Sequence, residues 1–175
     1  MDEVGHLIAQ FRAEDITQVR DSSNKIALLR QLEQHYGDDQ RVLPFLLEVL
    51  SDTQEYDLAR IEALKFFELK EEEDEDIGRQ VGQAIKHILA HDPDDEVRNY
   101  AAMAASSYVG VNGIVGELEK VIFNPEEDVN IRWSAFAAIE EMGPTNQSKR
   151  IMVKALQDEE FKEYTARVLD IWQSG

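Results

Sequence analysis

Two histidines four residues apart, His87 and His91, are the first groups along the chain whose spacing suggests chemistry. Residues i and i+4 lie on one face of a helix, and a His-x-x-x-His pair on one face can bind zinc. A zinc site needs a third ligand, however, and Ile88 occupies the position of the glutamate in the His-Glu-x-x-His motif. Two imidazoles near the C-terminal end of a helix are also favoured by the partial negative charge there. We therefore expect no metal site at this pair.

The remaining motif-like stretches are incomplete. The acids within residues 92–96 are spaced like calcium ligands, but Pro93 and the helical pattern after it do not fit an EF-hand loop. Gly113 and Gly116 are not followed by the Lys-Ser or Lys-Thr pair of a phosphate-binding loop. The chain has no cysteine, which excludes disulfides, thiol nucleophiles and Cys-rich zinc sites. We therefore expect a non-enzymatic protein with no catalytic residue, no metal and no cofactor.

The acidic composition limits the partners that the chain can bind. It has 36 Asp and Glu against 18 Lys and Arg in 175 residues, a net charge of -18. Such a field repels nucleic acid phosphates and accelerates encounter with a basic protein. The same charge can instead serve only to keep a protein in solution, and the sequence leaves that alternative open. The first six residues lack the basic region of a signal peptide, and no stretch has the roughly 20 apolar residues of a membrane span, so we expect a cytoplasmic protein.

A short acidic phrase recurs along the chain. Residues 92–97 and 124–129 each consist of Asp or Asn, proline, three acids and valine. Looser copies lie at Asp52 and Asp158, and a further one lies at Asp21. The copies at 21, 52, 92, 124 and 158 are 31, 40, 32 and 34 residues apart. A period in the thirties is typical of an array of helical repeats within one domain, here residues 1–175.

The apolar spacing between these phrases is helical. Val81, Ala84, Ile85 and Ile88 illustrate the i, i+3, i+4, i+7 stripe of a helix covered on one side, and no segment alternates as a strand does. Helices after a phrase are alanine-rich, which suits inner helices with neighbours on several sides. Glycines stand where these inner helices should stop, at positions 37, 110 and 143. The pattern predicts an all-α chain of five helix pairs at approximately 3–36, 39–70, 74–108, 111–142 and 145–173.

One acidic run separates the second and third predicted pairs. We place it in an exposed loop or at a frayed helix start. A solvated, self-repelling linker is one interpretation, and a docking strip for a basic partner is the other. The residues of this acidic loop are Glu71, Glu72, Glu73, Asp74, Glu75 and Asp76.

The phrase and the helix after it resemble the HEAT-like repeat family, in particular its short-repeat branch related to phycobilin lyase subunits. Over about residues 50–142, an Asp/Asn-Pro-acid turn is followed by Val-Arg at Arg98, or by Arg132 two places later, and then by an alanine-rich helix. The resemblance implies a right-handed α-solenoid of about five antiparallel helix pairs. It also implies that Arg98 and Arg132 brace a turn acid of their own or a neighbouring repeat. Family members mostly bind macromolecules along a concave face lined by the second helices.

The aromatic residues Tyr100 and Trp133 lie early in two predicted inner helices. Aromatic and arginine side chains supply much of the binding energy at interfaces when they face a groove. Core packing is the alternative for a tryptophan at helical spacing. The residues that we expect to contact a partner are Asp57, Arg60, Asn99, Tyr100, Asn130, Trp133 and Glu163.

These observations favour a protein-binding module. Its small size and acidity suit an inhibitor or immunity-type protein that neutralises a basic partner such as a nuclease toxin. An accessory scaffold or regulatory subunit that binds a neutral partner through Tyr100 and Trp133 is the first alternative. A chromophore-lyase-like enzyme is the second, and family likeness alone suggests it.

Overall fold

The computed structural model describes residues 2–14, 19–69 and 74–174, with only the backbone described for residues 19–22. These residues form ten α-helices and one short 3-10 helix and contain no strand, which confirms the prediction of an all-α chain. The helices are α1 (Glu3–Ala13), α2 (Val19–Tyr36), α3 (Val42–Ser51), α4 (Asp57–Leu69), α5 (Glu75–His91), α6 (Asp95–Ala104), η1 (Ala105–Tyr108), α7 (Ile114–Ile122), α8 (Val129–Glu141), α9 (Asn146–Ala155) and α10 (Lys162–Ser174).

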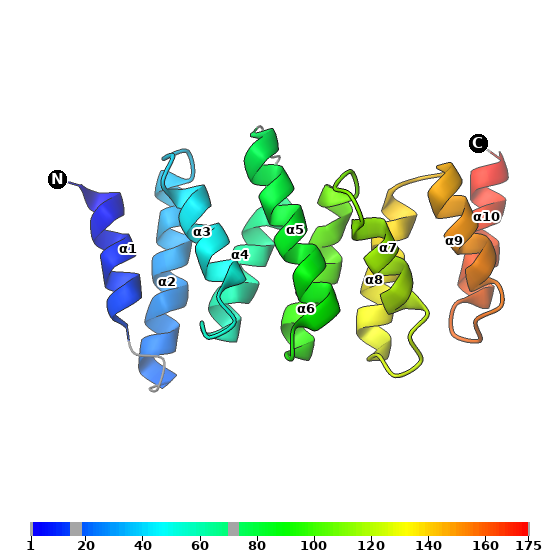
Figure 1. Ribbon diagram of the computed structural model, residues 1–175, viewed down its shortest axis with the longest axis horizontal. Coiled ribbons are helices and arrows are strands. Elements are labelled where there is room, and N and C mark those ends of the chain that lie inside the picture. Colours follow the sequence, from blue (N-terminus) through cyan, green and yellow to red (C-terminus); the bar gives the residue numbers. More distant parts are fainter. Residues whose placement is uncertain (1, 15–18, 70–73, 175) are drawn as a thin grey trace.

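The helices lie side by side in one row, with α1 at one end and α10 at the other (Figure 1). Each odd-numbered helix contacts the even-numbered helix that follows it. In addition, α2, α4, α6 and α8 contact one another in that order. Most packing therefore joins segments that are close in sequence, and the even-numbered helices form a continuous layer.

The acidic phrases fold into turns because each one both ends a helix and begins the next. Asp92 is the C-cap of α5, and two residues later Asp94 is the N-cap of α6, where its carboxylate accepts from the Val97 N–H at 2.9 Å. Asp128 caps α8 in the same way through the Asn130 N–H at 2.8 Å. These carboxylates satisfy amides that have no partner inside the helix. The recurring acids are thus local folding signals in the first place.

Gly143 follows the C-cap residue of α8 in the left-handed conformation, with φ 67°. That conformation favours glycine, so the stop predicted there has its expected physical basis. Gly37 and Gly110, the other two predicted stops, have no such positive φ. The helices before them end without a left-handed glycine.

The core follows the inner layer of helices. Four alanines of α6 and η1 are fully buried. Their small side chains allow α6 to contact α4, α5 and α8 at once. Helix α4 is buried over most of its length, including Leu64 and Phe67 at 0% exposure. The alanine-rich pattern therefore marks helices with neighbours on several sides.

A tight contact between Gly82 of α5 and Val111, in the turn before α7, gives a prediction about stability. A Cβ atom at Gly82 would lie 2.6 Å from Val111 Cγ2 and 2.9 Å from Val111 Cβ. Gly82→Ala should gain about 1 kcal/mol in helix propensity but lose about 1–3 kcal/mol through overpacking. We expect a net loss of up to about 2 kcal/mol in the free energy of unfolding, measured in urea.

The matched control is Gly116→Ala in α7, where nothing lies within 4 Å of the added Cβ. It should be neutral or stabilising by up to about 1 kcal/mol. Adding Val111→Ala to Gly82→Ala should restore much of the loss. A Gly82→Ala variant as stable as Gly116→Ala would show that the contact does not constrain the fold.

Candidate functional site

A basic side chain on each of α2, α4, α6 and α8 forms an ion pair with an acid in the turn before the next even-numbered helix. Each of these ion pairs is wholly or largely removed from solvent. Such bonds connect consecutive turns along the row. The pairs are Lys25 with Glu55 at 2.7 Å, Arg60 with Asp92, Arg98 with Glu127 at 2.8 Å, and Arg132 with Asp158 at 2.6 Å.

The three arginines also hold the end of the preceding odd-numbered helix. Arg98 donates to the Asp92 carbonyl at 2.7 Å, and Arg132 Nε donates to the Ile122 carbonyl at 2.8 Å. Arg60 Nε donates to the carbonyl of Leu50 at 3.3 Å. Each guanidinium therefore joins its own turn to the next one.

Arg60 does not lie where a partner could reach it. The residue is 1% exposed, and its guanidinium is held by Asp92 and by the backbone of α3. The prediction that Arg60 contacts a partner is therefore corrected. Sequence alone could not show this, because the burial depends on α3 and α5 packing around the start of α4.

Other predicted contact residues also have partners within the fold. Asn99 Oδ1 accepts from Ser134 Oγ at 2.8 Å, which joins α6 to α8. Asn130 donates from its side-chain amide to Asp128 at 3.0 Å within the turn before α8. Asp57 and Glu163 are exposed at the starts of α4 and α10. Of these four, Asp57, Asn130 and Glu163 are exposed, and Asn99 is half-buried.

Trp133 is partly core and partly surface. It is half-buried in a cluster with Phe136, Phe161 and Tyr164, with ring centroids 5.6, 4.6 and 5.6 Å away, and its Nε1 donates to Glu160 at 2.7 Å. Phe136 and Phe161 are buried, whereas Tyr164 is 38% exposed. The cluster therefore anchors α10 to α8 and presents an aromatic edge to solvent.

Tyr100 is also half-buried, and the Nζ atom of Lys65 lies 4.9 Å from its ring centroid. On α10, Tyr164 donates its hydroxyl to Glu140 of α8 at 3.3 Å. The negative charge of Glu140 raises the pKa of Tyr164. The even-numbered helices thus combine aromatic rings with charged groups.

A groove of about 410 Å³ crosses this layer of helices. Its floor is apolar, with Met103 from α6 and Ala137 from α8, and Met103 is 39% exposed. Glutamates from α4 and α8 also line it. We call this the inner groove, and its lining residues are Glu68, Met103, Trp133, Ser134, Ala137, Ala138 and Glu141.

The two glutamates of the inner groove repel one another. Burial, and then the negative charge of Glu141, raise the pKa of Glu68 above its ordinary value, with a smaller opposing effect from Lys65. Within the described part of the chain, no ion pair or side-chain hydrogen bond involves either carboxylate. Among the other partly buried glutamates, Glu62 pairs with Arg30 at 2.6 Å, whereas Glu33, whose pKa burial also raises, forms no ion pair with a described residue. The inner groove therefore holds a partly buried carboxylate, Glu68, and an exposed one, Glu141, beside an apolar floor.

This repulsion gives a second prediction. Because the pKa of Glu68 is higher in the folded than in the unfolded state, its ionised form costs folding free energy above that pKa, and the cost disappears as pH falls through it. Glu68→Gln should therefore be more stable than the parent at pH 7 by less than about 1 kcal/mol, since partly exposed charges are screened. Urea unfolding at pH 7 and pH 4 measures the difference, which should shrink at the lower pH.

The control for this variant is Glu126→Gln. Glu126 is exposed in the turn before α8, so the substitution changes the net charge equally and should leave stability nearly unchanged. A Glu68→Gln variant that is less stable than the parent at pH 7 would contradict the repulsion.

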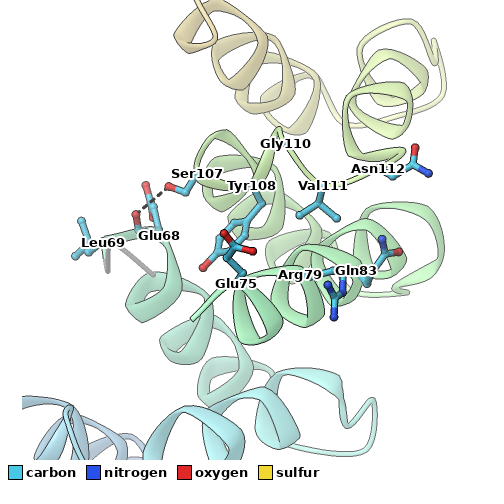
Figure 2. A pocket seen from close by; sticks show the side chains of 11 residues that line it. Glu68, Leu69, Glu75, Arg79, Gln83, Ser107, Tyr108, Gly110, Val111 and Asn112 are labelled. Carbon is cyan, nitrogen blue, oxygen red and sulfur yellow. Dashed lines mark hydrogen bonds between the residues drawn. The ribbon is translucent and has the colours of Figure 1, made fainter. Parts of the chain in front are cut away.

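A second hollow of about 680 Å³ lies beyond the end of α4 (Figure 2). Glu68 lines both this hollow and the inner groove. One wall is apolar, with Tyr108 and Val111, and Ser107 Oγ donates to the Glu68 carbonyl at 3.2 Å. Leu69 at its rim is 83% exposed. Glu68 and Leu69 at the end of α4 and Glu75 at the start of α5 border the hollow. The full lining is Glu68, Leu69, Glu75, Gly78, Arg79, Gln83, Ser107, Tyr108, Gly110, Val111 and Asn112.

The predicted acidic loop is only partly described. Glu71, Glu72 and Glu73 lie outside the described residues. Asp74 is the N-cap of α5 and accepts from the Asp76 and Ile77 amides at 2.9 and 3.2 Å. Glu75 and Asp76 form the first turn of α5, so these two lie at a helix start, the second of the two predicted placements, and not in a loop. Their charges face the positive end of the helix dipole, which favours the helix start.

His87 and His91 lie on one face of α5, with ring centroids 4.9 Å apart. Both residues are exposed. Among the residues that the structure describes, no group of three or more His, Asp or Glu is arranged to hold a metal ion. The pair therefore lacks the third ligand that a zinc site needs.

The described helices include none that is both long and apolar enough to cross a membrane. Comparison with protein-family models, curated protein sequences and solved structures finds no match to this chain.

The sequence patterns did not point to the inner groove. Glu68 and Glu141 come 16 and 17 residues after Asp52 and Asn124, the phrases of their respective repeats, so their positions differ by one residue. A comparison of equivalent positions between repeats would therefore not have paired them. The abundance of acids also hides any such pair in a chain with 36 Asp and Glu.

Proposed function

We propose that this chain is a non-enzymatic protein-binding module built as a right-handed α-solenoid of five antiparallel helix pairs of the HEAT-like kind. The row of helices and the contacts between successive even-numbered helices support this architecture. The ion pairs from each turn to the next repeat with the same connectivity along the row. In such an array, the layer of second helices is a continuous binding surface.

The partner is a basic protein that binds across the inner groove. The observation that carries this proposal is the pair of groove carboxylates, Glu68 and Glu141, which form no ion pair with a described residue and lie beside the apolar floor. A folded protein gains nothing from two repelling charges in a groove unless a cation compensates them. The net charge of -18 acts at longer range and accelerates encounter with such a partner.

The function that fits best is that of an acidic inhibitor or immunity-type protein, which neutralises a basic partner such as a nuclease toxin. A nuclease binds phosphates through basic residues, so an acidic surface of matching charge can occupy the same residues and block the enzyme. Stoichiometric blocking needs only binding.

Affinity capture with the full chain, at low and at high salt, tests the basic-partner proposal. Electrostatically driven association should weaken steeply between about 50 and 500 mM salt, because the Debye length falls from over 10 Å to a few Å. Mass spectrometry should identify a specific basic protein in the low-salt eluate, and the purified partner should rebind with 1:1 stoichiometry. Specific partners that are all neutral or acidic would overturn the proposal.

An accessory scaffold that binds a neutral protein is the second candidate. The exposed edges of Met103 and Tyr164, 39% and 38% exposed, favour it, because apolar side chains at a groove can anchor an uncharged partner. Binding that does not change with salt concentration would support this candidate over the first.

A further inference from the structure

We propose that the inner groove is the receptor for one arginine side chain of the partner, with the guanidinium between Glu68 and Glu141 and the aliphatic stem over Met103 and Ala137. This inference rests on the proposed protein-binding function and names what the partner must present.

The size of the groove suits one long side chain. Its volume of about 410 Å³ lies towards the lower end of the roughly 300–1,000 Å³ typical of small-ligand sites. Met103, Ala137 and Ala138 contribute apolar side chains to the lining, and Trp133 also lines the groove. Cationic side chains with long aliphatic stems pack well on such a floor while their charged ends reach polar groups.

The acids of the groove come from two different helices. Glu68 belongs to α4 and Glu141 to α8, and both line the groove. A guanidinium has five N–H donors in a planar fork, so it can serve two carboxylates at once. It is also less strongly hydrated than an ammonium group and loses less on entering a partly apolar groove. The geometry therefore favours arginine over lysine.

Among the described residues, no basic side chain forms an ion pair with Glu68 or Glu141. Lys65, the basic residue that acts on Glu68, lies 3.9 Å from Glu62 and over the Tyr100 ring. Elsewhere the fold provides an arginine for comparable glutamates, as Arg98 does for Glu127 and Arg150 for Glu119. The groove differs from these sites because its carboxylates have no internal partner within the described residues.

A titration of the full-length protein with a short probe tests the inference. The probe is the peptide acetyl-Ala-Arg-Ala-amide, and its citrulline analogue is a neutral isostere. Two-dimensional NMR should show saturable shifts of the Trp133 indole N–H and of the Met103 and Ala137 amides with the arginine peptide. The citrulline peptide should cause none at equal concentration.

Variants then locate the site. Glu68→Gln and Glu141→Gln should each weaken binding of the arginine peptide roughly tenfold, the loss expected for a hydrogen bond to a charged group. The matched control Glu126→Gln, with the same change in net charge outside the groove, should bind like the parent. Since Glu68→Gln is expected to stabilise the fold, its loss of binding would not reflect unfolding.

Three outcomes would overturn the inference. Equal binding of the citrulline peptide would remove the role of charge, and equal or tighter binding of a lysine peptide would remove the preference for arginine. If both groove variants bind the arginine peptide as Glu126→Gln does, the site lies elsewhere. A basic partner could still bind the acidic surface in that last case, so failure of the arginine site differs from failure of the proposed function, which the salt-dependent capture tests.

Discussion

Arg60→Met is expected to lower the free energy of unfolding by about 3–5 kcal/mol, the cost of breaking a buried ion pair by removing one partner. Arg60 and Asp92 have side-chain exposures of 2% and 1%. Without the guanidinium, the Asp92 carboxylate stays buried with only an amide hydrogen bond, from Asp94 N at 3.1 Å. The Leu50 carbonyl loses the Arg60 donor as well. Methionine retains most of the stem volume, so the loss reports the charge more than a cavity.

Urea unfolding followed by circular dichroism measures this loss. The control is Arg30→Met, because Arg30 forms a comparable pair with Glu62 but its side chain is 54% exposed. A partly solvated pair of this kind should contribute about 1 kcal/mol or less. If Arg60→Met costs no more than Arg30→Met, the turn-to-turn pair at Asp92 does not stabilise the fold.

Much of the secondary structure could be predicted from the sequence because its signals act locally. Asp92 and Asp94 end one helix and begin the next within three residues, and proline between them stops the incoming helix. The alanines of α6 indicated a helix with neighbours on several sides, and they are buried. Signals of this kind depend on residues within one or two turns of each other.

The site could not be predicted in the same way because its parts are distant in sequence. Glu68 and Glu141 are contributed by α4 and α8, and only the packing of both helices against α6 brings them into one groove. The prediction for Arg60 was wrong for the same reason. Arginine is usually exposed, and nothing in the local sequence indicates that α3 and α5 enclose this one. Charged side chains can be assigned to surface, ion pair or groove only once the helices are placed.

The two kinds of charge have opposite physical consequences. Charges between the turns are compensated, so they fix how successive helices stack. The Glu68 and Glu141 carboxylates of the inner groove form no ion pair with a described residue. Their repulsion reduces stability, and they remain able to attract a cationic partner. This division explains why Glu68→Gln is expected to stabilise the protein and weaken binding together.

Phe161→Ala is expected to be the most damaging single truncation at the C-terminal end of the row. Phe161 is fully buried, stacks on Phe136 at 4.9 Å and lies 4.6 Å from Trp133. Removing a buried phenylalanine side chain costs about 3–5 kcal/mol, because the cavity that remains is only partly filled. The matched control is Val153→Ala, since Val153 is 58% exposed and its truncation should cost less than about 0.5 kcal/mol.

The loss should be local, because α9 and α10 stand at the end of the row and Phe161 joins them to α8. In a stack of repeats, terminal units can open without the rest. Hydrogen exchange should therefore accelerate at least about a hundredfold in α9 and α10, the factor that corresponds to about 3 kcal/mol, while the amides of α4 keep their protection. The inner groove would then still bind the arginine peptide. Equal loss of protection in α4 and α10 would instead mean that the chain unfolds as one cooperative unit, as a closed helical bundle would, and the proposed solenoid would have to be abandoned.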